Sequence, residues 1–105
     1  MTWSEWMLYN CDYKTISTFW NDFSIAEQFG VDAIQDTYNR AFREWKSDYK
    51  MLTELIMVLN HKIAYYYGQI NTYAKIYDTL WKKADAYAMN HLKGEALRYF
   101  LETTD

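Results

Sequence analysis

The fold is decided by one stretch of the sequence, residues 33–67, which read AIQDTYNRAFREWKSDYKMLTELIMVLNHKIAYYY. Apolar residues recur along it in steps of three and four, at positions 34, 38, 41, 45, 49, 52, 56, 59, 63 and 66. That spacing is typical of one face of an α-helix, and the chain contains no proline to interrupt it. We therefore predict one continuous helix over 33–67, roughly 50 Å long at about 1.5 Å per residue. The alternative is a break near residue 47, where Ser47 or Asp48 could cap a new helix.

The middle of this stretch, from Met51 to Leu59, contains only two polar residues, Thr53 and Glu54. A helix that is apolar over so wide an arc is normally covered on more than one side. The segment is therefore predicted to be the central helix of the fold.

Shorter helices are predicted after the long one. Asn71 or Thr72 can cap a helix over about 71–92, whose apolar residues again recur in steps of three and four. This helix should fold back antiparallel against the long one. Gly94 is a second stop signal, and a last short helix is expected over 95–101.

The N-terminal third is predicted to contain two short helices. Capping boxes at Thr2-x-x-Glu5 and Ser24-x-x-Glu27 indicate helices over 3–10 and 25–29, joined by an irregular link over 10–18. Gly30 should end the second, and Asp32 could cap the long helix. The prediction is thus an all-α single domain over 1–105: a long antiparallel helical hairpin flanked by short N-terminal and C-terminal helices.

Composition excludes several classes of protein. Of the 105 residues, 50% are hydrophobic and 20% aromatic, which is too apolar for a disordered chain. A lone Cys11 cannot form an internal disulfide framework. No window approaches eighteen apolar residues, and residues 1–5 lack the basic region and apolar run of a signal peptide. We therefore expect a cytoplasmic protein with no membrane partner.

No pattern of catalytic or metal-binding residues stands out. His61 and His91 lie thirty residues apart without a second ligand at helical spacing, and Cys11 sits beside Asp12, which disfavours a thiolate. His91 is expected to cap carbonyl groups near a helix C-terminus. We therefore expect no enzymatic activity, no cofactor and no metal.

Residues 25–31, IAEQFGV, are similar to the first helix and turn of a helix-turn-helix motif. Residues 25–44, however, carry four acids and two bases, the wrong sign for contact with phosphate. Nucleic acid is therefore not the expected partner. A DNA-associated regulator that uses the corner at 25–43 remains an alternative hypothesis.

Two groups of residues are candidates for a partner-binding site. The first is a basic edge on the long helix, which could meet phosphate, an acidic partner or the protein's own acidic first third: Arg40, Arg43, Lys46 and Lys50. The second is aromatic, because consecutive tyrosines on a helix point about 100° apart and cannot all face one core. It comprises Tyr65, Tyr66 and Tyr67, together with Trp3 and Trp6 near the N-terminus. The competing interpretation is that these rings fill a thin core and leave their polar atoms at its rim.

Three segments resemble small helical proteins encoded by phages and mobile elements of gut-type Gram-positive bacteria: DFSIAEQFG at 22–30, AIQDTYNRAF at 33–42 and the stretch from Tyr49 to Ile63. The resemblance implies a bacterial host cell and a chain that acts by binding a host protein, including defence systems. The leading hypothesis is therefore a protein-interaction module that inhibits or modulates a host factor. The third hypothesis, after the DNA-associated regulator, is a homodimeric structural or accessory subunit.

Overall fold

The computed structural model describes residues 13–68 and 71–104, with residues 13–20 described as backbone only. Within these residues the chain forms helices and no strand, which confirms the predicted all-α class. The elements are α2 (Tyr13–Phe29), α3 (Val31–Trp45), α4 (Tyr49–Tyr66), α5 (Thr72–His91) and α6 (Glu95–Thr104). The molecule measures 37 × 28 × 23 Å along its principal axes.

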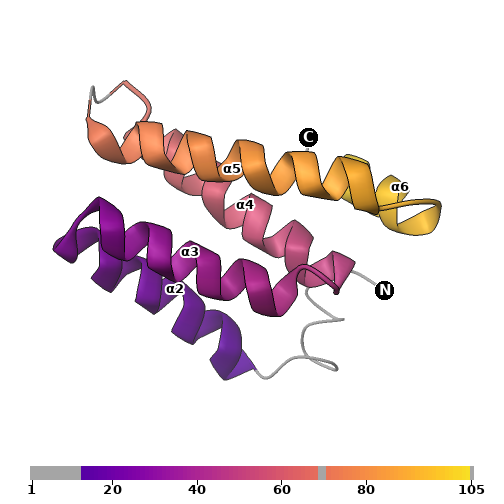
Figure 1. Cartoon of the computed structure of the whole chain (residues 1–105), viewed down its shortest axis with the longest axis horizontal. Helices are drawn as coiled ribbons and strands as arrows, with labels where there is room; N and C mark the ends of the chain where they lie inside the picture. The colour runs from indigo at the N-terminus through magenta and orange to yellow at the C-terminus, as the bar shows by residue number, and fades with distance from the viewer. Residues whose placement is uncertain (1–12, 69–70, 105) are drawn as a thin grey trace.

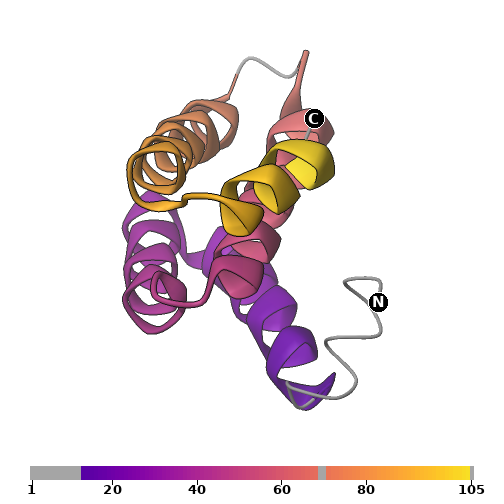
Figure 2. The same cartoon turned by 90° about the vertical axis from the view of Figure 1, so that its right-hand side faces the viewer.

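The helices form two hairpins that pack against each other (Figures 1 and 2). In the first, α2 and α3 pack together; in the second, α4 runs antiparallel to α5 with the most extensive contact in the molecule. The helix α3 also packs against α4 and α5, and α6 folds back onto α4. The α2–α3 turn, the end of α4 and the start of α5 lie at one end of the molecule. The α3–α4 and α5–α6 connections lie at the opposite end.

The prediction of one continuous helix over 33–67 is wrong, and the alternative of a break near residue 47 is correct. The helix α3 ends at Trp45, and α4 begins at Tyr49. Asp48 adopts an extended conformation there, and its carboxylate accepts hydrogen bonds from the backbone N–H of Lys50 (3.0 Å) and Met51 (3.2 Å). This N-cap stabilises a new helix start. The steps of three and four between apolar residues continue across the link. They continue because the apolar face of α3 and the apolar face of α4 pack against one common core.

The N-terminal third also differs from the prediction. The helix α2 is continuous from Tyr13 to Phe29, so Ser24 lies inside a helix rather than at its start, and the part of the predicted link over 13–18 is helical. Burial of Phe23 and Ala26, on either side of Ser24, favours the continuous helix. Gly30 ends α2 with φ of +109°, a conformation that suits glycine, as predicted. The predicted helix over 3–10 lies outside the described residues.

The predicted starts and ends of the other helices can be compared in the same way. Gly30, not Asp32, occupies the N-cap of α3, so the predicted Asp32 cap is wrong, and Asp32 lies in the first turn instead. Asn71 caps α5 as predicted, accepting a hydrogen bond from the N–H of Ala74 at 3.0 Å. The ring of His91 bonds the carbonyl of Tyr87 (2.9 Å) in the last turn of α5, also as predicted. The last helix extends three residues beyond the predicted 95–101.

The helix α4 is the centre of the fold, as its apolar arc predicts. The side chains of Leu52, Leu55, Ile56 and Leu59 are completely buried. Even Thr53 is buried, and its hydroxyl donates to the carbonyl of Tyr49 at 2.7 Å, which satisfies it within the helix. The remaining core comes from the faces of the other helices, with Phe23, Ile34, Tyr38, Tyr77, Leu80, Ala84, Ala88 and Phe100 among its members.

Replacing Asp48 with alanine is expected to lower the free energy of unfolding by about 0.5–2 kcal/mol, because two backbone N–H groups of α4 lose their acceptor. Urea denaturation followed by tryptophan fluorescence measures the difference. Asp48→Asn, which keeps an oxygen acceptor, should retain most of the stability. Equal losses in the two variants would contradict a capping role.

Candidate interaction surface

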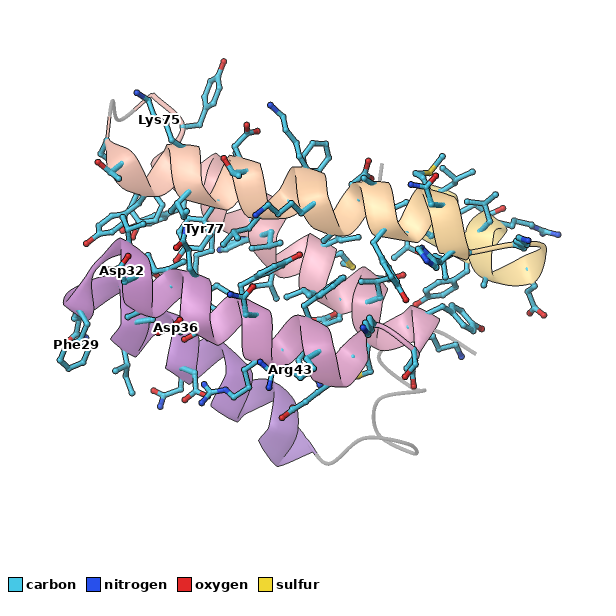
Figure 3. The ribbon with its side chains drawn as sticks, viewed as in Figure 1. Phe29, Asp32, Asp36, Arg43, Lys75 and Tyr77 are labelled. Atoms are coloured by element: carbon cyan, nitrogen blue, oxygen red, sulfur yellow. The ribbon has the colours of Figure 1, made fainter. Side chains whose placement is uncertain are left out.

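Large aromatic side chains are exposed at the end of the molecule where α2 meets α3 and α4 meets α5. Phe29, the last residue of α2, is 78% exposed. Tyr65 and Tyr67, at the end of α4, are 65% and 84% exposed. Figure 3 shows Phe29 projecting from the tip of the α2–α3 hairpin. We call these three residues the aromatic end.

The residues next to the exposed rings are held in a polar cluster that joins α2, α4 and α5. The Glu27 carboxylate accepts hydrogen bonds from the ammonium of Lys62 and the hydroxyl of Tyr66. The hydroxyl of Tyr73 donates to the Glu27 carbonyl at 2.8 Å. The Lys62 and Glu27 side chains are only 13% and 12% exposed, so the ion pair is largely shielded from water. The cluster fixes the last turn of α2 against the α4–α5 hairpin.

Stacked tyrosine rings extend the cluster into the core. The ring of Tyr66 lies 5.6 Å from that of Tyr73 and stacks on Tyr77 at 6.0 Å. Tyr77 is completely buried, and its hydroxyl has no hydrogen-bond partner among the described residues. Burial, and then the charge of the nearby Glu27 carboxylate, raises the pKa of Tyr77 far above its usual range. Tyr77 therefore stays neutral, and its ring packs against that of Tyr66.

Anchored and exposed residues alternate at this end. Phe29 follows the anchored Glu27 by two positions, and the anchored Tyr66 lies between Tyr65 and Tyr67. The Tyr65 ring also packs edge-on against Tyr66 at 4.9 Å. The exposed rings therefore start from backbone that is held in place, which lowers the entropy lost when a partner binds them.

The predicted aromatic site residues fall into three groups. Tyr65 and Tyr67 are exposed, whereas Tyr66 is half-buried in the cluster. Trp3 and Trp6 lie outside the described residues. Phe29 was not among the predicted site residues. Phe29 directly precedes Gly30, where α2 ends and α3 begins. That position at the junction of two helices is the sequence feature that could have indicated it.

The predicted basic edge is divided by the break between α3 and α4. Arg40 forms an exposed ion pair with Asp22 on α2 at 3.3 Å, so this residue meets the protein's own acidic first third. Arg43 and Lys46 are exposed, at the C-terminal end of α3 and just after it. Lys50 lies on α4, so it does not continue the edge of α3, and its ammonium lies 5.8 Å and 5.9 Å from the ring centres of Tyr49 and Tyr99.

The Glu27–Lys62 pair was not predicted from the sequence. Glu27 fits a capping-box pattern, and the two residues are 35 positions apart. The available signal was weak: Lys62 and Tyr66, four residues apart, share one helix face beside a largely apolar segment.

The described residues contain neither a cluster of metal ligands nor a helix that could span a membrane. Over 13–68 and 71–104, no three His, Cys, Asp or Glu side chains gather closely enough to hold a metal ion. No helix in that part of the chain is long and apolar enough to cross a membrane. Comparison of the whole chain with protein-family models, curated proteins and solved structures finds no match.

Proposed function

We propose that this protein is an interaction module that binds a partner protein through the aromatic end. The observation that carries the proposal is the exposure of Phe29, Tyr65 and Tyr67 on backbone fixed by the Glu27 cluster. Tyrosine and other aromatic residues are enriched at protein interfaces, where they act as anchors in pockets of the partner. In line with the phage and mobile-element resemblance, the proposed partner is a host protein that the module inhibits or modulates.

The dimensions of the aromatic end suit such a contact. It lies across the longest axis of the molecule, so its width is at most the two shorter extents, 28 and 23 Å. A standard protein interface buries about 800 Å² on each side, which is of the same order as the area of this end. One partner that covers the end would therefore reach both the α2–α3 turn and the last turn of α4.

Charge defines the partner's surface further. Asp32 and Asp36 are exposed on the first turns of α3, which begins two residues after Phe29 (Figure 3). Neither carboxylate forms an ion pair within the described residues. The fitting partner therefore presents apolar pockets flanked by lysine or arginine. The same two carboxylates would face phosphate if α3 approached DNA, so the DNA-associated regulator is not the function that we propose.

Truncation of Phe29 or Tyr67 to alanine should weaken partner binding at least tenfold, since each change removes an anchor side chain. A photo-crosslinking amino acid at position 67 first identifies the partner in host lysate, and isothermal titration calorimetry then measures its affinity for each variant. Both rings are highly exposed, so the variants should fold with stability within about 0.5 kcal/mol of the wild type.

Met89→Ala and Leu101→Ala are the matched controls, because these residues are exposed and apolar but lie on α5 and α6 away from the aromatic end. Each should bind within twofold of the wild type. Equal weakening in all four variants would argue against a localised site. A concentration-dependent dimer in light scattering, or retention on heparin at moderate salt, would instead support a homodimeric subunit or a DNA-associated regulator.

A further inference from the structure

A cleft opens at the end of the molecule opposite the aromatic end, where the α3–α4 and α5–α6 connections meet. The cleft is shallow and open to solvent, and its volume is about 510 Å³, within the range of about 300–1,000 Å³ typical of small-molecule sites. Lys46 and Ser47 line it from the α3–α4 link, and Leu92 and Lys93 line it from the α5–α6 link. The fold thus joins two segments that are more than forty residues apart in the sequence.

The charged side chains of the described residues that line the cleft are all basic. The ammonium groups of Lys46 and Lys93 are exposed, and neither forms an ion pair within the described residues. Among the described residues, no carboxylate lines the cleft. Asp48, next to Ser47 in the sequence, directs its carboxylate to the N–H groups of its own helix. Glu95, two residues after Lys93, is exposed but does not line the cleft.

The helix dipoles do not change the positive charge of the cleft. The helices α3 and α5 end at the cleft, while α4 and α6 begin there, so the partial charges of their ends largely offset one another. The full charges of the two lysines therefore determine what the cleft attracts. Ser47 adds a hydroxyl that can donate a hydrogen bond to an anionic oxygen.

The rest of the lining is aromatic and apolar. The rings of Tyr87 and His91 are stacked at 3.8 Å and form one wall. Tyr49 also lines the cleft, and Leu92 and Ala96 add aliphatic surface. The Nδ1 atom of His91 is engaged by the Tyr87 carbonyl, which fixes the ring on its own helix. Aromatic and aliphatic side chains of this kind pack more favourably against a flat ring of a ligand than against a chain of charged groups.

We infer that this cleft binds a small phosphorylated molecule that carries a flat ring, a ligand of the nucleotide type. The phosphate lies between Lys46 and Lys93 and accepts from Ser47, and the ring packs against Tyr49 and the Tyr87–His91 wall. The site is independent of the aromatic end, because the two lie at opposite ends of the long axis.

Titration of the ¹⁵N-labelled chain, followed by NMR, tests the inference with inorganic phosphate and with adenosine monophosphate. Adenosine monophosphate should give saturable shifts of the Ser47 and Lys93 amides, with a dissociation constant of about 1 mM or below, equivalent to about −4 kcal/mol. Inorganic phosphate should shift the same amides but bind at least threefold more weakly. Equal affinities would overturn the assignment of a ring-bearing ligand, and no saturation below 10 mM would overturn the site.

The double variant Lys46→Gln/Lys93→Gln should weaken binding of adenosine monophosphate at least tenfold. Its matched control, Lys75→Gln/Lys83→Gln, removes the same charge from two exposed lysines that do not line the cleft. The control should bind within twofold of the wild type. Equal weakening in both would show a general effect of net charge, and unchanged binding in the first variant would show that Lys46 and Lys93 serve only the helix ends.

Discussion

Replacing Glu27 with alanine is expected to lower the free energy of unfolding by about 3 kcal/mol. Loss of one partner from a buried ion pair typically costs about 3–5 kcal/mol, because the remaining charge stays out of water without compensation. We expect the lower end because the Lys62 and Glu27 side chains retain 13% and 12% exposure. The same change takes the acceptor from the Tyr66 hydroxyl. Urea denaturation at neutral pH measures the loss.

Asp22→Ala is the matched control for this prediction. It removes a carboxylate from an ion pair that also joins α2 to another helix, but the Arg40 and Asp22 side chains are 60% and 36% exposed. An exposed pair contributes about 0–1 kcal/mol, so the control should lose far less stability. If Glu27→Ala costs no more than Asp22→Ala, the cluster does not hold α2 in place.

A double-mutant cycle separates the pair from its surroundings. Lys62→Met combined with Glu27→Gln removes both charges while keeping side chains of similar volume, and the amide oxygen can still accept from Tyr66. The double variant should be more stable than the sum of the single losses predicts, with a coupling energy of about 0.5–3 kcal/mol. Strict additivity would mean that Lys62 and Glu27 do not act as a pair.

The variant Glu27→Ala also connects stability to the proposed function. Phe29 lies two residues beyond Glu27, and Tyr66 separates Tyr65 from Tyr67. Loosening the cluster should therefore weaken partner binding even though the three exposed rings remain. A loss of affinity without any loss of aromatic residues is the expected signature of a surface that depends on preorganisation.

Helical periodicity predicted most of the fold because it is a local property. The apolar arc of Met51 to Leu59 indicated a central helix, and the cap at Asn71 and the stop at Gly94 placed the later helices. Periodicity could not place the break at Asp48, because the three- and four-residue steps continue through the link. The predicted helix start at Ser24 was wrong for a related reason, because a capping-box pattern also occurs inside helices. Burial of Phe23 and Ala26 favours the continuous helix α2.

The candidate surface was less predictable because it depends on contacts between residues that are far apart in the sequence. The 100° spacing of consecutive helical residues indicated that Tyr65, Tyr66 and Tyr67 could not share one environment, but it did not indicate which ring turns inward. That is decided by Glu27, which approaches Tyr66 only after the two hairpins pack together. The cleft at the other end likewise depends on the chance that two links meet, so Lys93 carried no local signal.

Replacing Leu52 with alanine is expected to lower the free energy of unfolding by about 2–5 kcal/mol. The Leu52 side chain is completely buried on α4, the helix that contacts α3, α5 and α6, so the resulting cavity cannot be filled from solvent. Ile56→Ala, one turn further along the same face and also completely buried, should cost a similar amount. Leu101→Ala is the control, because that side chain is 41% exposed and should cost well under 1 kcal/mol. Urea and thermal unfolding, both followed by circular dichroism, measure the differences. If the midpoints of the Leu52 and Ile56 variants match that of the wild type, α4 is not the helix on which the core is built.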